Sequence, residues 1–265
     1  MEPASGTPGL LIDLDGVLYQ GERAIPGATE TVAWIRSQGI PHLFLTNTTS
    51  RPRAALVDKL TDLGIDTTED AIHTPPVAAV RWLATSAPGP AALFVPPATA
   101  TEFGALPLLP EDAEEGAASV VIGDLGEGWT FGRLNRAFRL LMAEPHPVLV
   151  ALGMTRYFRS PEGLRLDVAP FVKALEHAAG TTAVILGKPA APFFEAALDA
   201  LGCRSADAVM VGDDIVGDVG GAQHAGIRGV LVRTGKFRPT DLEGEVHPDA
   251  VLPSIAELPG WWPGR

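Results

Sequence analysis

The sequence contains a single cysteine, Cys203, so no disulfide bond can form within the chain. It also has no apolar run near the ~18–20 residues that span a bilayer, which argues against a membrane-crossing segment. Residues 1–8 have neither the basic start nor the apolar stretch of a signal peptide. These absences predict a cytoplasmic protein with no membrane partner.

Basic residues are also scarce, at 20 Lys and Arg against 32 Asp and Glu, which gives a net charge of −12. Nucleic-acid binding depends on Lys and Arg that neutralise phosphates, so nucleic acid is not an expected partner. A small phosphorylated substrate is compatible with this charge, because a bound metal and a few placed cations can reverse the potential locally.

Hydrophobic residues make up 46% of the 265, enough for the core of one large domain or of two smaller ones. Near both ends of the chain, short apolar runs alternate with segments of helical periodicity. Because these runs are apolar on both faces, they predict parallel core strands covered by helices. The expected strands are 9–14, 41–46, 183–187, 208–212 and 229–232, and the expected helices are 28–37, 52–63, 192–201 and 219–225.

The middle of the chain has its own set of elements. They are expected strands at 91–95, 119–122 and 148–152 and an amphipathic helix at 131–142. We therefore expect an α/β protein with a doubly wound parallel-sheet (Rossmann-like) core formed by residues 1–77 and 183–265. Residues 78–182 are expected to form an inserted α/β domain.

Two carboxylates, Asp13 and Asp15, lie at the end of the first predicted strand. Acidic side chains placed together at the end of a buried strand are costly unless a cation or protons compensate their charge. A hard divalent cation with oxygen ligands is the natural compensation. The alternative is a pair of turn or helix-capping aspartates, since Asp-Gly is a common turn pair.

A second polar cluster follows the second predicted strand. Thr46 and Asn47 begin a segment that also contains Thr48, Thr49 and Ser50, directly before a predicted helix. Free N–H groups and hydroxyls at a helix N-terminus suit an anion such as phosphate. A plain helix cap is an equally good interpretation of this cluster taken alone.

Lys188 and three acids complete the set of polar clusters. Lys188 follows the apolar run 183–187 and needs an anionic partner if it is buried; otherwise it opens an exposed turn. Asp213, Asp214 and Asp218 follow the run 208–212, as part of the same site or as a solvated acidic turn. Ligands bind at the carboxyl ends of parallel strands, so the four clusters together predict one site equipped for phosphoryl transfer.

In this order, the four clusters resemble the motifs of the haloacid dehalogenase-like hydrolase superfamily. The matching residues are DLDGV at 13–17, Thr46-Asn47, Lys188-Pro189 and GDDIVGD at 212–218. The long segment between Thr46 and Lys188 leaves room for a large α/β cap, as in the nitrophenylphosphatase-type branch. Three longer stretches, LTNTTSRPRAAL, MTRYFRSPEGLRL and GDDIVGDVGGAQHAGIRGVLVRTGKFRP, are similar to the subgroup around phospholysine phosphohistidine inorganic pyrophosphate phosphatase.

The resemblance implies roles for the matched residues. Asp13 would attack phosphorus and become an aspartyl phosphate, and Asp15 would protonate the leaving group and then activate water. The implied catalytic residues are Asp13, Asp15, Thr46 and Lys188, and the implied substrate-binding residues are Gly16, Thr46, Asn47 and Lys188. The implied Mg²⁺ ligands are Asp13, the backbone carbonyl of Asp15, and Asp213, supported by Asp214 and Asp218.

The expected function is that of a Mg²⁺-dependent phosphatase acting on a small phosphorylated metabolite or pyrophosphate. Two alternatives stay open: a phosphoramidate or pyrophosphate hydrolase with the same chemistry, and a non-catalytic phosphate-binding regulatory protein. The resemblance also suggests a homodimer. Residues 78–182 would be the cap, with Arg156, Tyr157 and Arg159 as candidate substrate contacts.

Overall fold

The computed structural model describes residues 8–160 and 162–262. The described chain divides into two compact units, the first made of residues 8–46, 53–73 and 188–262 and the second of 47–52 and 74–187. The predicted inserted domain, 78–182, lies wholly within the second unit. Its assignment as a separate cap domain stays a prediction.

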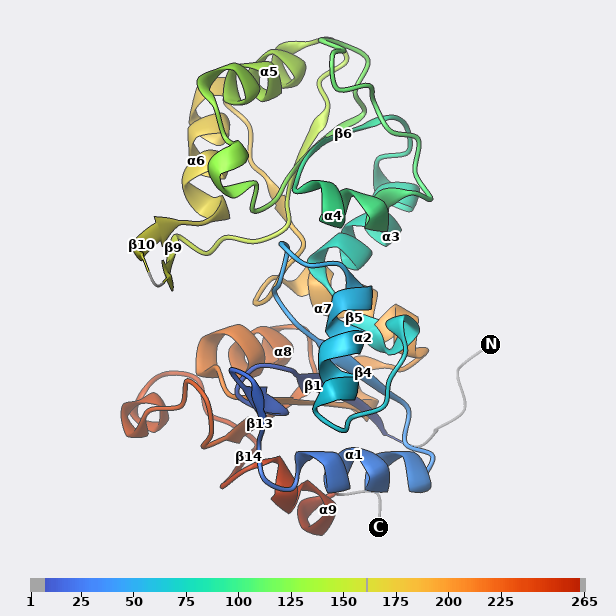
Figure 1. The fold of residues 1–265 in the computed structure, drawn as a ribbon, viewed down its shortest axis with the longest axis vertical. Helices are drawn as coiled ribbons and strands as arrows, with labels where there is room; N and C mark the ends of the chain where they lie inside the picture. Colours follow the sequence, from blue (N-terminus) through green and yellow to red (C-terminus); the bar gives the residue numbers. More distant parts are fainter. Residues whose placement is uncertain (1–7, 161, 263–265) are drawn as a thin grey trace. The chain divides into compact units, whose positions relative to one another are not determined.

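The first unit is built on a six-stranded sheet in the order β14-β13-β12-β1-β4-β5 (Figure 1). Every neighbouring pair in this sheet is parallel. The strands are β1 (Gly9–Asp13), β4 (His42–Leu45), β5 (Ile72–His73), β12 (Ala208–Gly212), β13 (Arg228–Val232) and β14 (Ala250–Leu252). The predicted parallel α/β core is therefore confirmed, with β5 and β14 as short strands that the apolar pattern does not reveal.

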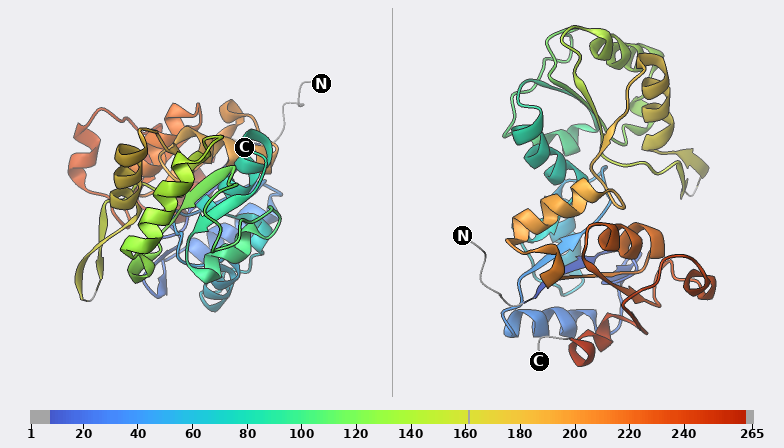
Figure 2. Two further views of the ribbon diagram at one scale, coloured as in Figure 1. Left: turned by 90° about the horizontal axis from the view of Figure 1, so that it is seen from above. Right: turned by 180° about the vertical axis from the view of Figure 1, so that it is seen from behind.

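Helices cover both faces of this sheet. Leu10 and Ile12 of β1 belong to one hydrophobic cluster with the buried sides of α1, α2 and α9. Leu11 points to the opposite face, because side chains alternate along a strand, and Figures 1 and 2 show α7 and α8 there. The helices are α1 (Ala28–Ser37), α2 (Arg53–Asp62), α7 (Ala191–Leu201), α8 (Gly221–His224) and α9 (Leu258–Trp261).

Local signals set the ends of these helices. Helix α1 has the predicted bounds, and Gly39 just beyond it has φ +64°, the left-handed conformation that commonly ends a helix.

At the other end of the chain, Trp262 is buried within the cluster that contains Leu10 and Ile12. None of the helices in the described ranges combines the length and the apolar character that a membrane crossing requires.

The second unit has its own four-stranded parallel sheet, in the order β11-β8-β7-β6. A separate hydrophobic cluster packs its strands against α5 and α6. The strands are β6 (Ala91–Phe94), β7 (Ser119–Ile122), β8 (Val148–Ala151) and β11 (Val184–Ile185), and the hairpin consists of β9 (Tyr157–Ser160) and β10 (Gly163–Leu166). The helices are α3 (Pro75–Ser86), α4 (Pro97–Ala100), α5 (Phe131–Met142) and α6 (Val168–Ala179).

The prediction that 183–187 forms a core strand is wrong. Strand β11 pairs with β8 in the sheet of the second unit, with Val184 opposite Val150 and Ile185 opposite Ala151. Val184 and Ile185 are only half-buried, as expected of an edge strand. An apolar run shows that a segment is buried, but it does not show which of two sheets it joins.

The predicted helix 219–225 also differs from the structure. Residues Ile215–Gly220 form a π-helix, which continues directly into α8. The Val219 N–H donates to the Asp214 carbonyl oxygen at 3.2 Å, the five-residue spacing of a π turn. Helical structure therefore begins earlier than predicted and includes Asp218.

Candidate active site

Three buried carboxylates meet at the carboxyl ends of β1 and β12. Asp13 is the last residue of β1, Asp213 follows β12, and Asp218 belongs to the π-helix. These residues are 7%, 1% and 1% exposed, and one oxygen from each lies within 4.8 Å of the others. Strands β1 and β12 are adjacent and parallel, so the sheet itself brings Asp13 and Asp213 together.

Lys188 lies against this group of acids. Its ammonium group donates hydrogen bonds to Asp13 Oδ1 and, at 2.6 Å, to Asp218 Oδ1. The side chain is buried, so these are charge-assisted bonds shielded from water. Three carboxylates against one ammonium leave an excess of two negative charges when all four groups are ionised (3 − 1 = 2). A divalent cation would balance that excess.

The π turn explains how Asp218 reaches the site. Its Oδ2 accepts hydrogen bonds from the backbone N–H groups of Asp213 and Asp214, both at 3.2 Å. Gly212 permits this approach, since a Cβ built on it would lie 2.2 Å from the Cβ of Asp218. Asp218 thus fixes the backbone after β12 and also holds Lys188.

Asp213 provides the test of whether a metal fits. Its Oδ2 accepts a hydrogen bond from the Lys236 backbone N–H at 2.6 Å, while its buried Oδ1 has no hydrogen-bond partner among the described residues. A buried polar atom without a partner calls for an explanation such as an ion or a water molecule. An all-oxygen group with one unpartnered carboxylate oxygen fits a hard divalent cation.

The pKa values follow from burial and charge. Burial raises the pKa of Asp13 to about 8, and the neighbouring Asp218 and Asp213 add to that rise while Lys188 opposes it. Burial likewise raises the pKa of Asp213 to about 6. The hydrogen bond from the Lys236 N–H opposes that rise, because it stabilises the charged carboxylate. Burial alone would lower the pKa of Lys188, but the carboxylates of Asp13 and Asp218 raise it. Lys188 is therefore cationic. Its single positive charge does not balance the three carboxylates of Asp13, Asp213 and Asp218 when all are ionised.

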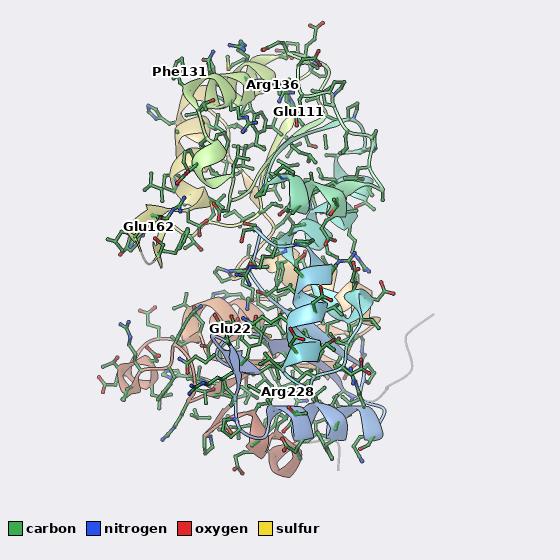
Figure 3. All side chains as sticks on the ribbon, in the orientation of Figure 1. Glu22, Glu111, Phe131, Arg136, Glu162 and Arg228 are labelled. Atoms are coloured by element: carbon green, nitrogen blue, oxygen red, sulfur yellow. The ribbon has the colours of Figure 1, made fainter. Side chains whose placement is uncertain are left out.

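Asp15 lies on the turn that follows β1. Its side chain is exposed and is not one of the three grouped carboxylates. The chain then forms the hairpin of β2 (Tyr19–Gln20) and β3 (Arg23–Ala24), and Figure 3 shows Glu22 on its turn. Glu22 pairs with Lys59 of α2 at 3.2 Å, which ties the hairpin to the body of the first unit.

The carboxylate of Asp214 makes its contacts outside the group formed by Asp13, Asp213 and Asp218. Its Oδ1 accepts hydrogen bonds from the N–H groups of Val216 (3.1 Å) and Gly217 (2.8 Å), and its Oδ2 lies 3.2 Å from the Lys236 ammonium. Although burial favours the neutral form, these donors lower the pKa of Asp214. Asp214 therefore caps the π-helix rather than facing Asp13.

Thr46 and Asn47 follow β4, whose Leu45 lies opposite Asp13 in the sheet. The Thr46 N–H donates to the His73 carbonyl oxygen at 3.2 Å. Asn47 belongs to the second unit, where its Oδ1 lies 3.3 Å from the position that a Gly187 Cβ would take. Their phosphate-binding roles stay predictions.

The predicted cap contacts all lie in the second unit. Tyr157 is 51% exposed in β9, and the Arg156 guanidinium carbon lies 5.7 Å from the centre of its ring. The side chain of Arg159 lies outside the described part of the chain. The role of these three residues as substrate contacts therefore stays a prediction.

Two residues that contact the site, Thr234 and Lys236, are not predicted from the sequence. They follow β13, next to β12 in the sheet. Thr234 Oγ1 donates to the Gly16 carbonyl oxygen, and the Lys236 N–H donates to Asp213. A signal does exist, since they follow a predicted core strand at the same edge of the sheet and lie within the stretch 212–239 that carries the resemblance, but no role is predicted for either residue.

If the acid group holds a divalent cation, Gly16→Ala is expected to weaken its binding by about 10- to 100-fold, the usual effect of disturbing the surroundings of a metal ligand. Gly16 has φ +89°, and a Cβ on it would lie 2.0 Å from Asp213 Oδ2. The matched control is Gly21→Ala, which has φ +61° but no atom within 4 Å of the added Cβ. Isothermal titration with Mg²⁺ would compare the two, and equal affinities would contradict the prediction.

Both the sequence and the fold are similar to those of known proteins. Residues 10–103 match the family model described as haloacid dehalogenase-like hydrolase, and residues 185–258 match a second model, HAD-hydrolase-like. The chain is 41% identical to phospholysine phosphohistidine inorganic pyrophosphate phosphatase from Homo sapiens, over 96% of this chain and 93% of that protein.

Solved structures of two nitrophenylphosphatases are also similar to this chain. The p-nitrophenyl phosphatase from Archaeoglobus fulgidus has a TM-score of 0.85 and 25% identity, covering 95% of this chain and 98% of that one. The 4-nitrophenylphosphatase from Thermotoga maritima has a TM-score of 0.83 and 27% identity, with coverages of 94% and 95%.

Proposed function

The chain belongs to the haloacid dehalogenase-like hydrolases, and we propose that it is a Mg²⁺-dependent phosphatase that forms a phosphorylated intermediate on Asp13. Its relatives are named as phosphatases, which supports phosphate release as the reaction. The observation that carries the proposal is the contact of buried Asp13 with Lys188, inside a group of carboxylates with one unpartnered oxygen.

In the first half of the proposed reaction, Asp13 is the nucleophile. A carboxylate oxygen of Asp13 forms a bond to phosphorus as the bond from phosphorus to the leaving oxygen breaks. The attacking form of Asp13 is the ionised carboxylate, and a phosphate is negatively charged too, so both the ionisation of Asp13 and its approach to phosphorus need positive charge nearby. Lys188, hydrogen-bonded to Asp13, supplies one such charge.

Asp15 is proposed as the general acid and base. Its exposed carboxyl group can reach a substrate that enters from solvent. It would donate a proton to the leaving oxygen and then take one from the water that attacks the phosphorylated Asp13. The second attack breaks the bond between phosphorus and Asp13, releases phosphate and regenerates both carboxyl groups.

The proposed Mg²⁺ ligands are Asp13, Asp213 and the backbone carbonyl of Asp15. When bound, the ion would supply Lewis-acid stabilisation of charge on the phosphate. The unpartnered Oδ1 of Asp213 supports its place in this set. The hydrogen bonds of Asp218 to Lys188 and to the backbone after β12 support a positioning role for Asp218.

Gly16, Thr46, Asn47 and Lys188 are the proposed phosphate-binding residues. Thr46 and Asn47 offer a hydroxyl and an amide beyond β4, the strand next to β1. We propose that the second unit is the cap domain and supplies the residues that select the substrate. A homodimer and a cytoplasmic location are further parts of the proposal, the latter supported by the single cysteine.

The substrate class separates two versions of the proposal. The named substrates of the relatives include inorganic pyrophosphate in one case and p-nitrophenyl phosphate in the other. The higher sequence identity, 41%, is to the pyrophosphate and phosphohistidine enzyme. We therefore keep pyrophosphate and phosphoramidates beside ordinary phosphomonoesters as candidate substrates.

Phosphate release from p-nitrophenyl phosphate and from pyrophosphate, measured in parallel with Mg²⁺ and with EDTA, is the test. We expect release from at least one substrate with Mg²⁺ and none above background with EDTA. Equal release in EDTA would contradict the metal dependence. No release from these or from a panel of phosphorylated metabolites would favour a non-catalytic phosphate-binding protein.

A further inference from the structure

We infer that Thr234 is a positioning residue of the active site, and that the segment 234–236 holds both the turn after Asp13 and the carboxylate of Asp213 in their working geometry. This inference rests on the proposed function. The segment follows β13. It contacts the site through the Thr234 hydroxyl, the Cα of Gly235, which carries no side chain, and the backbone N–H of Lys236.

The first contact is the Thr234 hydroxyl, which donates a hydrogen bond to the Gly16 carbonyl oxygen. Gly16 also donates its own N–H to the Tyr19 carbonyl oxygen at 2.7 Å. As a glycine with φ +89°, Gly16 has no side chain to limit its backbone motion. The two hydrogen bonds therefore fix the turn that carries Asp15 after the end of β1.

The second contact depends on Gly235 having no side chain. A Cβ on Gly235 would lie 2.0 Å from Asp213 Oδ2 and 2.5 Å from the Cα of Gly16. Gly235 has φ +63°, which also favours glycine. The absence of side chains on both glycines lets the segment pack directly against the turn after Asp13.

The third contact is the Lys236 backbone N–H, which donates to Asp213 Oδ2 at 2.6 Å. This bond occupies one carboxylate oxygen and leaves the buried Oδ1 without a partner. Partners of this kind orient metal ligands and affect metal affinity. The Lys236 ammonium pairs with Asp214 from an exposed side chain (69%), so we assign the positioning effect to the N–H.

Thr234→Val tests the first contact, because valine keeps the shape of threonine and removes its hydroxyl. We expect kcat for the better of the two substrates to fall about 10- to 100-fold, as misplaced catalytic groups cause. Thr234→Ser should restore most of the rate. The control, Thr240→Val, changes an exposed threonine and should leave kcat unchanged. A Thr234→Val variant with wild-type kcat, or with reduced thermal stability as its only change, would overturn the assignment.

Hydrogen exchange gives a readout that needs neither metal nor turnover. In Thr234→Val, amides in a peptide covering residues 14–19 should exchange faster than in the wild type and in Thr240→Val, with all three proteins in EDTA. Unchanged exchange there would overturn the inference even if the protein were an active phosphatase. Faster exchange in a protein without any phosphatase activity would refute the proposed function and retain the positioning role.

Gly235→Ala tests the approach of the segment to Asp213. We expect Mg²⁺ affinity, measured by isothermal titration without substrate, to fall about 10- to 100-fold. Gly39→Ala is the matched control, since Gly39 has φ +64° and no atom within 4 Å of an added Cβ. Equal Mg²⁺ affinity in the two variants would contradict the role of Gly235. If the wild type bound no Mg²⁺, that role and the metal part of the proposed function would both be rejected.

Discussion

Asp13→Asn is expected to lower kcat for phosphate release by on the order of 10⁴-fold or more, because an amide is a far weaker nucleophile than a carboxylate. Asparagine has almost the same shape as aspartate, and it can still accept a hydrogen bond from Lys188 through its amide oxygen. The fold should therefore persist. Burial disfavours the charged form of Asp13 and raises its pKa to about 8, and an uncharged amide does not carry that cost. Steady-state release from the better substrate, with Mg²⁺, measures the effect.

The control for this change is Asp62→Asn, which alters the charge in the same way at an exposed position at the end of α2. Its kcat should equal that of the wild type. Mass spectrometry after brief incubation with substrate adds a direct readout, because only the wild type and the control should gain a phosphoryl group. Retained turnover in Asp13→Asn at a matched thermal midpoint would assign the nucleophile to another residue.

The elements that the sequence predicts best are those with strong local signals. Helix α5 and strands β7 and β12 have the predicted bounds. In α5, apolar residues recur at helical spacing, and the Thr130 side chain caps the first turn by accepting from the Arg133 N–H. Such signals lie within a few residues of each other and need no knowledge of the fold.

Sheet membership is different, because it depends on partners distant in the chain. The run 183–187 is apolar and ends in a polar cluster, as the core strands do, yet β11 pairs with β8. Lys188 still reaches Asp13, since it is the first residue after the second unit ends at Gly187. Of the two interpretations of Lys188, the structure shows the buried lysine with anionic partners, although the strand assigned to carry it was wrong.

The membership of the acid group is likewise only partly predictable from the sequence. Asp13 and Asp213 follow adjacent parallel strands, so the order of motifs was enough to bring them together. The sequence does not separate Asp214 from Asp218, because both follow the same strand. Only the π turn decides that Asp218 turns inward to Lys188 while Asp214 caps the turn. Segment 234–236 was missed for a related reason, since two of its three contacts use the backbone of Gly235 and Lys236, which composition does not reveal.

Lys188→Met is expected to destabilise the fold by about 3–5 kcal/mol, because it removes the cation shared by two buried carboxylates. Methionine has a similar length and apolar stem, so packing is largely kept. Phosphate release should also fall by about 10²–10³-fold, the usual effect of losing one charge that stabilises the transition state. Urea denaturation in EDTA measures the stability, and Lys173→Met, at a 67% exposed lysine of α6, is the control.

The stability deficit of Lys188→Met should grow with pH. In the folded wild type, burial raises the pKa of Asp13 from 3.8 to about 8, so the folded state holds a proton that the unfolded state has lost, and stability falls as pH rises between these values. Lys188 opposes that rise in the pKa of Asp13. Up to about pH 8 the acid is protonated in both folded proteins, so this part of the deficit is small there. Above about pH 8 the folded wild type can release the proton because Lys188 pairs with the carboxylate, whereas the variant must keep the proton or bury an unpaired charge. The difference in unfolding free energy between wild type and variant should therefore be larger at about pH 9.5 than at about pH 5. Equal differences at the two values would mean that Lys188 does not compensate the charge of Asp13.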